Sequence, residues 1–270
     1  MTSQSERAER FRRLHADGLL LLANAWDAGS ARLIESLGAQ AVATTSAGVA
    51  WAHGFADGDR LPVPRLIATV ADIARAVRVP LSVDMEGGYS DDPDTVADHV
   101  AGAIDVGAVG INLEDGGGAP DALCAKIERI KRAAARLGAD VFVNARTDVY
   151  LRGLVPPERR VEETLARAAR YRAAGADGLF VPGLTDETQV RAIAAGGGLP
   201  LNLLARAALP PAARLRDWGV RRLSAGSDLA QSAHARVRSL AAGFLHDGDS
   251  KPLAAEAMAY TELNALFEPR

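Results

Sequence analysis

Short apolar segments alternate with longer helical stretches along most of this chain, and the alternation limits the folds that it can adopt. The short segments are rich in Val, Ile and Leu, whereas the stretches between them are rich in Ala, Arg and Leu at helical spacing. Such a pattern is typical of βα units in which a parallel sheet is buried on both faces. The segments that fit lie at residues 19–24, 41–45, 81–84, 110–113, 141–146, 178–181, 201–204 and 221–224.

Eight units in one continuous series predict an α/β fold of the (β/α)8 TIM-barrel type rather than an open, doubly wound sheet. No linker or change of composition divides the series, so residues 1–270 are expected to form a single barrel domain. Two Ala-rich helical stretches, 232–245 and 253–267, follow Asp228 and make residues 229–270 a C-terminal helical extension. We expect one of these helices to leave its own barrel and pack elsewhere.

The charge, cysteine content and hydropathy of the chain exclude several classes of protein. The formal net charge is -3, from 31 basic and 34 acidic residues spread along the sequence, so no field of one sign would attract nucleic acid or an anionic membrane. We therefore expect the binding partner to be a small molecule. Cys124 is the only cysteine, which excludes an intrachain disulfide and fits a reducing cytoplasm. No apolar run is long enough to span a bilayer, and no signal peptide is recognisable at the N-terminus.

Acidic residues follow two neighbouring segments of the series, at the point where each predicted strand ends. Asp84 and Glu86 end the third strand, and Glu114 and Asp115 end the fourth. In a parallel barrel the C-terminal ends of the strands meet at one mouth, where reactive groups lie. Oxygen-rich surroundings without thiolates suit Mg²⁺, and Mn²⁺ could substitute for it. We therefore predict that Asp84, Glu86 and Glu114 bind a metal ion or the substrate.

Other polar residues occupy the same position in their units. Arg146 ends the fifth segment, and its planar guanidinium suits bidentate binding of a carboxylate or phosphonate. A structural pair with Asp148 or Asp84 is the alternative role for this arginine. Thr45 and Ser46, with nearby backbone N–H groups, could bind a further anionic oxygen. Trp26 follows the first segment and either walls the pocket or packs structurally, whereas Asn202 belongs to the seventh segment. Together these residues predict an anion-binding cradle at the mouth.

Five motifs at these strand ends resemble those of the isocitrate lyase/phosphoenolpyruvate mutase superfamily. In chain order they are Thr-Thr-Ser-Ala-Gly at 44–48, Gly-Phe-Ala-Asp at 54–57, Asp-Met-Glu-Gly-Gly-Tyr at 84–89, Asn-Leu-Glu-Asp at 112–115 and Asn-Ala-Arg-Thr-Asp at 144–148. Each motif alone is weak, but five in register are fairly specific. The resemblance implies an α/β barrel whose last helix is swapped between partners in a dimer of dimers, so we expect a homodimer or homotetramer.

The resemblance also implies roles for single residues. The three acids named above would hold Mg²⁺ partly through water, and Arg146 would stabilise a developing enolate. Asp57 would lie in the mobile loop after the second strand and is the candidate acid or base, with Asp59 as a close rival. The predicted catalytic residues are thus Asp57 and Arg146, and the predicted substrate-binding residues are Trp26, Thr45, Ser46, Ala47, Gly48, Arg146 and Asn202.

The segment after the fourth strand departs from both branches of the superfamily. Isocitrate and methylisocitrate lyases carry a Lys-Lys-Cys-Gly-His or Lys-Arg-Cys-Gly-His loop there, and the phosphonate enzymes have their own loop with Lys and Asn. This chain instead has Gly-Gly-Gly-Ala-Pro at 116–120, which is either a lid or a plain turn. Cys124 has no neighbouring His, so we expect a small buried hydrophobe there rather than a nucleophile.

These observations predict a Mg²⁺-dependent lyase that breaks a carbon–carbon bond of a 2-oxo or 2-hydroxy di- or tricarboxylate through an enolate. Isocitrate, methylisocitrate and oxaloacetate-like acids are the expected substrates. Two alternatives stay open: a phosphoenolpyruvate or phosphonopyruvate mutase or hydrolase, and a barrel that binds a 2-oxo acid without turnover. In each case the partner is a small carboxylate, and neither nucleic acid nor a membrane is involved.

Overall fold

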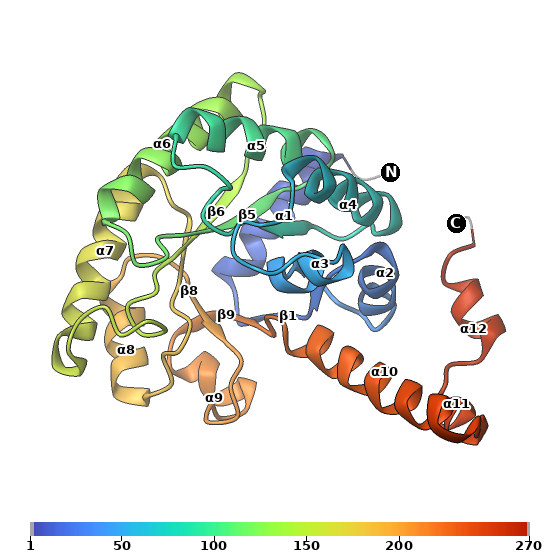
Figure 1. Ribbon diagram of the computed structural model, residues 1–270. Helices are drawn as coiled ribbons and strands as arrows, with labels where there is room; N and C mark the ends of the chain where they lie inside the picture. The colour runs from blue at the N-terminus through green and yellow to red at the C-terminus, as the bar shows by residue number, and fades with distance from the viewer. Residues whose placement is uncertain (1–2, 269–270) are drawn as a thin grey trace.

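The core of the protein is one sheet of parallel strands that curves into a nearly closed barrel, seen in a computed structural model that describes residues 3–268 (Figure 1). The strand order is β1-β9-β8-β7-β6-β5-β4-β3-β2. β1 (Leu20–Leu22) pairs with β9, and β2 (Asn24–Ala25) pairs with β3. Because β1 and β2 are two halves of one strand, interrupted at Ala23, the sheet closes upon itself there. The predicted (β/α)8 barrel is confirmed.

The strands lie where the apolar segments predict them, with differences of no more than one residue at either end. After the divided first strand they are β3 (Val42–Thr44), β4 (Leu81–Asp84), β5 (Gly110–Glu114), β6 (Phe142–Arg146), β7 (Gly178–Phe180), β8 (Leu201–Leu204) and β9 (Val220–Ser224). The helices that precede or follow them are α1 (Gln4–Ala16), α2 (Ala28–Ser36), α3 (Ser46–Ala52), α4 (Val63–Ala76), α5 (Pro93–Asp105), α6 (Pro120–Arg136), α7 (Arg160–Ala174), preceded by the 3-10 turn η1 (Pro157–Arg159), α8 (Glu187–Gly196) and α9 (Ala212–Asp217).

Local signals set where the helices begin and end. Asp92 precedes α5, and its carboxylate accepts a hydrogen bond from the backbone N–H of Thr95 at 3.0 Å, which satisfies an otherwise free donor of the first turn. Pro93 then starts the helix, where its missing N–H is harmless. Gly175 ends α7 with φ 108°, a left-handed conformation that glycine adopts without strain. Such sharp boundaries keep the connections short and place the strand ends accurately.

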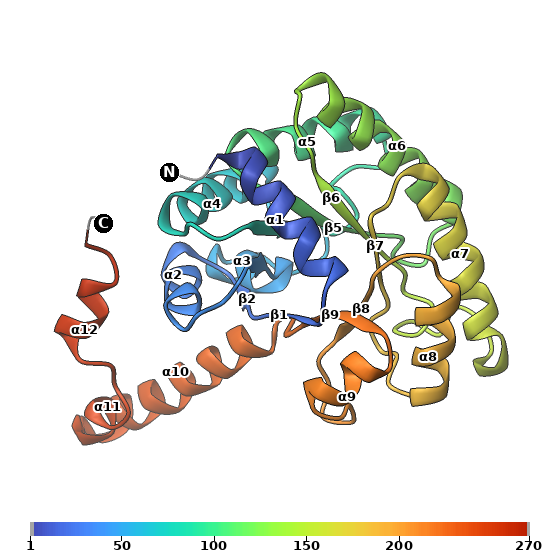
Figure 2. The ribbon, with the colours of Figure 1, turned by 180° about the vertical axis from the view of Figure 1, so that it is seen from behind.

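One end of the barrel is closed by α1, which crosses the strand starts in Figure 2. Phe11 of α1 is fully buried and meets the ring of Phe142 edge-on at 5.5 Å. His15 stacks on Phe142 at 4.1 Å. Arg12 forms ion pairs with Asp140 and Asp177, which precede β6 and β7. These contacts seal the N-terminal ends of the strands and leave the other end as the mouth.

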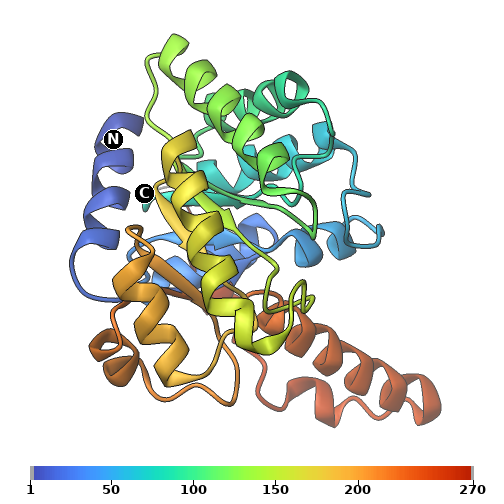
Figure 3. The same cartoon turned by 90° about the vertical axis from the view of Figure 1, so that its left-hand side faces the viewer.

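The C-terminal tail departs from the barrel. α10 (Asp228–Asp247) runs outward in Figures 1 and 3, and within the described part of the chain Ala230 is its one buried residue. The single helix predicted at 253–267 is wrong: the structure has α11 (Lys251–Ala254) and α12 (Tyr260–Ala265) instead. Glu256 separates them in a left-handed conformation (φ 60°), which an α-helix cannot include.

The end of the tail returns to the barrel surface, where the Nε of Arg32 on α2 donates to the carbonyl oxygen of Leu266 at 2.8 Å. None of the helices between residues 3 and 268 is both long and apolar enough to cross a membrane.

Candidate active site

The ends of β4, β5 and β6 bring three of the predicted site residues onto neighbouring strands. Asp84 is the last residue of β4, Glu114 of β5 and Arg146 of β6. Glu114 lies beside Arg146 in the sheet register. Asp84 lies beside Asn112, which precedes Glu114 by two residues. Because alternate residues of a strand share a face, all three site residues point to the same side of the sheet, at the mouth of the barrel.

Arg146 is held from two sides by carboxylates. Its Nη1 lies 2.5 Å from Oε2 of Glu114. Its Nε and Nη2 donate to the two oxygens of Asp148 at 2.7 and 3.1 Å, in bidentate geometry. Asp148 is fully buried and also accepts from the Nε of Arg152 at 3.0 Å. The guanidinium is therefore fixed in place, with Nη1 turned toward the acids of the mouth.

The carboxylates at the mouth repel one another. Burial raises the pKa of Glu114 to about 8, because it removes the carboxylate from water. The positive charge of Arg146 opposes this rise, whereas the negative charges of Asp84, Asp148 and Glu86 add to it. Glu114 is thus close enough to interact with both of the other acids that the sequence predicts as metal ligands.

Glu86 ties the loop after α3 to the end of β4. Its Oε2 accepts from the backbone N–H groups of Gly58 (2.8 Å) and Asp59, and its Oε1 accepts from the hydroxyl of Tyr89 at 2.7 Å. Asp59 in turn accepts from the backbone N–H of Tyr89 at 3.1 Å. Burial raises the pKa of Glu86, and the nearby charge of Asp57 adds to the rise. The loop therefore carries Asp57 to the acids.

The backbone at this junction is strained. Asp59, Glu86 and Tyr89 have φ values of 55°, 50° and 61°, in the left-handed region that residues other than glycine avoid. Within residues 3–268, Glu256 of the tail is the one other non-glycine residue in this region. Strain of this kind persists only where the surrounding structure enforces it, and it gathers at functional sites.

The start of α3 faces Asp84. The backbone N–H of Ser46 donates to Oδ2 of Asp84 at 3.2 Å, and the hydroxyl of Thr44 accepts from the backbone N–H of Asp84 at 2.8 Å. Burial raises the pKa of Asp57, while a hydrogen bond from Ser46 lowers it and the charge of Asp84 raises it further. Ser46, Asp57 and Asp84 therefore lie together on one side of the mouth.

Three predicted substrate-binding residues next to Ser46 are closely packed. Thr45 and Ala47 are buried. A Cβ atom at Gly48 would come within 2.8 Å of Thr45 Cγ2 and 2.9 Å of Trp26 Cβ, so only glycine fits there. Gly48 thus has a packing role in this structure, and contact of these residues with substrate stays a prediction.

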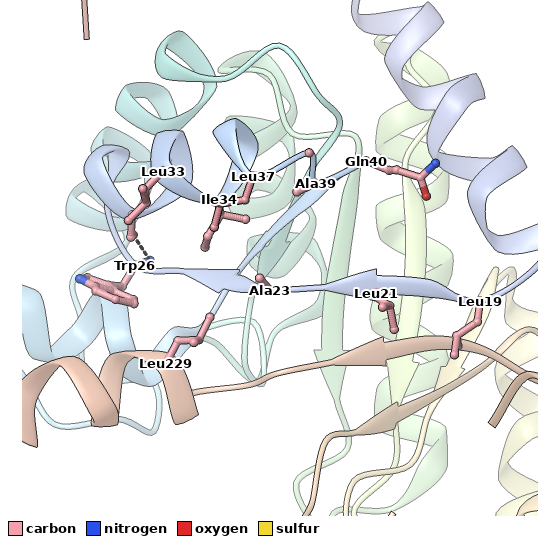
Figure 4. Close-up of a pocket in the computed structure, with 12 residues that line it drawn as sticks. Leu19, Leu21, Ala23, Trp26, Leu33, Ile34, Leu37, Ala39, Gln40 and Leu229 are labelled. Atoms are coloured by element: carbon pink, nitrogen blue, oxygen red, sulfur yellow. Dashed lines mark hydrogen bonds between the residues drawn. The ribbon is translucent and has the colours of Figure 1, made fainter. Parts of the chain in front are cut away.

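Trp26 lines a pocket on the outer face of the barrel (Figure 4), and none of the acids of the mouth is among the residues that line it. Residues 19, 21 and 23 of β1 and its flanks line this pocket, whereas Leu20 and Leu22 alternate with them and belong to the cluster inside the barrel. The pocket is mostly apolar, has a volume of about 690 Å³ and is completed by Leu33 of α2, by Leu37 directly after α2 and by Leu229 of α10. Of the two roles open for Trp26, its surroundings fit structural packing.

Asn202 lies inside the barrel below the mouth. β8 continues beyond it to Leu204, and its Oδ1 accepts from the hydroxyl of Ser224 at 3.0 Å. Asn202 is therefore not part of the cluster that joins Asp57, Asp84 and Glu86. Its contact with substrate stays a prediction.

Sequence reasoning missed the residues that support Arg146 from behind. Asp115 accepts from the backbone N–H of Asp148 at 2.9 Å through one oxygen. Its other oxygen accepts from Nη1 of Arg167 and from the hydroxyl of Tyr171, both at 2.7 Å. The spacing of Asp148, two residues after Arg146, indicates that these two side chains can pair. Nothing in the sequence pattern connects Arg167 or Tyr171 of α7 with this site.

The donor chemistry of the mouth fits a hard divalent cation. Among residues 3–268 no three His, Cys, Asp or Glu side chains are already arranged to hold a metal ion. The acids nevertheless supply only carboxylate oxygens, and a cation between them would relieve their mutual repulsion, which adds to the effect of burial on the pKa of Glu114. Within the described residues, Oδ1 of Asp84 accepts no hydrogen bond, whereas both oxygens of Glu86 are occupied. Asp84 is thus best placed for direct contact with a cation.

The fold and the site define a parallel (β/α)8 barrel with an acidic mouth and one fixed arginine. A family model described as phosphoenolpyruvate phosphomutase matches residues 11–245. The chain therefore belongs to this family, within the isocitrate lyase/phosphoenolpyruvate mutase superfamily of lyases and mutases.

Three similar proteins show the range of the family. An uncharacterized protein from Mycobacterium tuberculosis is 37% identical over 260 residues, which cover 94% of this chain and 95% of that protein. A crystal structure from Burkholderia cenocepacia J2315, provisionally assigned as a phosphonomutase, is 42% identical with a TM-score of 0.83 and covers 88% of this chain and 99% of its own. An oxaloacetate decarboxylase from Paraburkholderia xenovorans is 31% identical over 213 residues, 74% of this chain and 68% of that protein.

Proposed function

We propose that this chain is a Mg²⁺-dependent lyase of small 2-oxo dicarboxylates, with an oxaloacetate-like acid as the preferred substrate. It would break the bond between C3 and the second carboxylate, so that CO₂ leaves and the electron pair of that bond becomes the enolate of the 2-oxo acid. The observation that carries the proposal is the fixed guanidinium of Arg146, whose Nη1 faces Glu114 beside Asp84. A reducing cytoplasm, which suits the lone Cys124, is the proposed location.

In this proposal the metal ion is held directly by Asp84 and through water by Glu86 and Glu114. When bound, Mg²⁺ would act as a Lewis acid on the 2-oxo and carboxylate oxygens of the substrate. Mn²⁺ could substitute for it. The proposed ligands are oxygen atoms alone, which both ions accept.

The residues of the chain would then stabilise and position charge. Arg146 would donate to the substrate oxygen on which negative charge develops, and its bidentate bond to Asp148 keeps the guanidinium ready for that role. Asp57 is the proposed acid or base, because the loop places it beside Ser46 and Asp84 and burial raises its pKa toward the range useful for proton transfer.

The charges of the mouth favour a carboxylate over a phosphoryl group as the substrate. Phosphoryl transfer needs several cationic groups around the moving phosphorus. Arg146 is already paired with two carboxylates, Lys126 donates to the carbonyl of Gly87 at 2.7 Å, and residues 115–119 contain no lysine or arginine. Decarboxylation of an oxaloacetate-like acid, whose departing carboxylate is attached to the carbon beside the 2-oxo group, in contrast requires little beyond stabilisation of the enolate.

A phosphonate reaction is the second candidate, and the family match supports it. It would use the same mouth on phosphoenolpyruvate or phosphonopyruvate. Incubation with either compound, followed by ³¹P NMR, tests it: interconversion or release of phosphate that Asp57→Asn abolishes would favour the mutase or hydrolase over the lyase.

The lyase proposal is tested by measuring release of pyruvate or glyoxylate from oxaloacetate, isocitrate and 2-methylisocitrate, with and without EDTA. Since Mg²⁺ alone can decarboxylate oxaloacetate, Asp84→Asn in the same buffer is the baseline. We expect EDTA-sensitive turnover that Asp84→Asn lacks. Turnover that survives EDTA would contradict the proposed role of the metal ion. Tight binding of oxalate without any product would favour a barrel that binds a 2-oxo acid without turnover.

We further propose that two copies of the chain exchange α10, in a dimer or a dimer of dimers. The apolar pocket beside α2 has a volume of about 690 Å³ and lies where a helix after β9 would normally cover the barrel. α10 instead projects outward with Val237, Phe244 and Leu245 exposed (Figure 3). A second copy's α10 supplies the apolar surface that this pocket lacks.

Analytical ultracentrifugation tests the exchange. Leu37→Arg, in the pocket, should shift the protein toward the monomer, whereas Leu137→Arg, exposed at the end of α6 outside the pocket, should leave the oligomer intact. A wild-type protein that sediments as a monomer at micromolar concentration would contradict the exchange without touching the proposed reaction.

A further inference from the structure

Arg222 lies inside the barrel without a carboxylate in contact. It belongs to β9, where Val220, Arg222 and Ser224 are buried and Arg221, on the opposite face, is partly exposed. Its Nη2 donates to Oδ1 of Asn112 at 3.2 Å, and its Nε donates to the hydroxyl of Ser224 at 3.3 Å. Its Nη1 finds no hydrogen-bond partner among residues 3–268. The guanidinium is thus fully buried and only partly satisfied.

The other two buried arginines of the described chain, and the partly buried Arg146 at the mouth, are neutralised by direct contact with carboxylates. Arg32 meets Glu35 at 3.0 Å, Arg146 meets Glu114 and Asp148, and Arg167 meets Asp115 and Glu163. Placing a guanidinium in a protein interior without such a partner is unfavourable. Arg222 is therefore an exception within its own protein, and its charge calls for an explanation.

The sheet register places this charge just below the acidic mouth. Asn112, the partner of Arg222, lies beside Asp84 of β4 in the register. Asn112 also accepts from Nδ2 of Asn144 at 2.9 Å. Glu114 follows Asn112 by two residues on the same face of β5, a separation of about 7 Å. The guanidinium thus lies within about one layer of side chains from the acids.

Arg222 remains charged at neutral pH. Burial lowers its pKa to about 9, and the negative charge of Asp84 opposes the fall. A guanidinium with this pKa is still protonated at pH 7. The fixed positive charge below the mouth is therefore a permanent feature of the folded barrel.

We propose that Arg222 is an electrostatic positioning residue that makes the mouth select ligands with two negative charges over isosteric ligands with one. This inference rests on the proposed function, because the enolate of a 2-oxo acid carries its charge on two neighbouring oxygen-bearing groups. Arg222 does not touch the ligand; it acts through the field at the barrel axis. At about 8 Å and an effective dielectric constant near 20, one such charge pair corresponds to about a 30-fold preference.

Calorimetric titration with oxalate and oxamate in the presence of MgCl₂ tests the inference. The two probes have the same shape, but oxalate is a dianion and oxamate a monoanion. The wild-type protein should prefer oxalate, and Arg222→Met should reduce the ratio of the two affinities by about 10- to 30-fold. Arg221→Met makes the same change one residue away on the outward face and should leave the ratio unchanged.

Stability separates this role from a structural one. Since Arg222→Met removes a buried, unpaired charge and keeps the length of the side chain, its midpoint in urea should equal or exceed that of the wild type. If the variant does not fold, Arg222→Gln decides: it removes the charge while its amide can still donate to Oδ1 of Asn112, and a folded Arg222→Gln should show the same fall of about 10- to 30-fold in the affinity ratio.

The outcomes distinguish the two proposals. Wild-type protein that binds oxalate only with Mg²⁺, together with an unchanged affinity ratio in Arg222→Met, overturns the role of Arg222 and leaves the proposed function standing. A folded Arg222→Gln that keeps the wild-type ratio also overturns it. Wild-type protein that binds neither probe overturns both.

Discussion

The closed end and the mouth of the barrel are built from the two ends of the same strands, yet they use opposite chemistry. At the closed end, Phe11 and Phe142 pack edge-on among aliphatic side chains. At the mouth, Glu114, Arg146 and Asp148 form a buried group of charges. The same contrast holds for the backbone, because Asp59, Glu86 and Tyr89 adopt their left-handed conformations beside the mouth.

This difference teaches that stability and chemistry occupy separate layers of the barrel. Apolar burial at the closed end contributes free energy without constraining any reacting group. Charged side chains at the mouth are held in place by one another, and their mutual repulsion costs stability until a ligand or cation arrives. Substitutions at the two ends should therefore separate folding from activity.

The largest effect is expected at the closed end, from Phe11→Ala. This change removes a fully buried ring and should lower the free energy of unfolding by about 3–5 kcal/mol, measured by urea denaturation. Turnover per folded molecule should stay near the wild-type value. Leu137→Ala, at an exposed position, is the control and should change stability by less than about 0.5 kcal/mol. A marked loss of specific activity in Phe11→Ala would show that the two ends are not independent.

The next effect belongs to the mouth, from Arg146→Lys. The change keeps the charge but loses the bidentate bond to Asp148, and it should reduce turnover about 100-fold, or about 2.7 kcal/mol, with little change in the urea midpoint. Arg152→Lys alters a second, more exposed arginine on the same carboxylate and should reduce turnover far less. Equal losses in the two variants would contradict the special position of Arg146.

The pH dependence of the free energy of unfolding should include a contribution from His15 at the closed end. Burial lowers the pKa of His15 to about 3, and the nearby charge of Arg222 adds to the fall. The unfolded chain binds a proton near pH 6.5 and the folded chain does not, so stability is lost as the pH falls from about 6.5 toward 3. Between pH 7 and pH 5 the wild type should lose about 1–2 kcal/mol more than His15→Gln.

The control for this titration is His246→Gln, on the exposed end of α10, which should lose as much stability as the wild type over the same range. Urea unfolding at the two pH values measures both. A His15→Gln variant with the same pH dependence as the wild type would mean that His15 is protonated in the folded protein.

A second contribution to the pH dependence of stability comes from Glu114 at the mouth and has the opposite sign. The pKa of Glu114 is raised to about 8 in the metal-free protein, chiefly by burial, so the folded chain holds a proton that the unfolded chain releases. Stability should therefore fall as the pH rises from about 4.5 to 8. Glu114→Gln or added MgCl₂ should reduce this loss. Stability that rises through this range in the absence of metal would contradict the assignment.

Much of the fold could be predicted because parallel strands buried on both faces leave a plain record of apolar segments. The position of Asp84, Glu114 and Arg146 at the end of their units predicted that they lie at one mouth. The strand register brings the three residues together there. The tail was harder. The composition of 253–267 suits one helix, and only the backbone shows that Glu256 divides it.

Arg222 could not be predicted for a physical reason. Both faces of a barrel strand are buried, so the sequence Arg221-Arg222 does not reveal which arginine points to the axis and which to the outer layer. Trp26 illustrates the same ambiguity, since a residue after the first strand can face the mouth or the outer pocket. Long-range partners such as Arg167 and Asp115 are likewise separated by too much chain for spacing to connect them.

The seam at the first strand has a consequence for how the chain is made. β1 pairs with β9, so Leu20 cannot form its strand pairing until Arg222 has been made. At ordinary rates of synthesis this takes roughly 10–40 s after Leu20. Until then the nascent polypeptide carries an unpaired, leucine-rich edge that neighbouring chains can capture. Chaperones that shield such an edge should bind ribosome-attached chains that end before residue 220, and they should release chains long enough for residues 220–224 to have emerged from the exit tunnel.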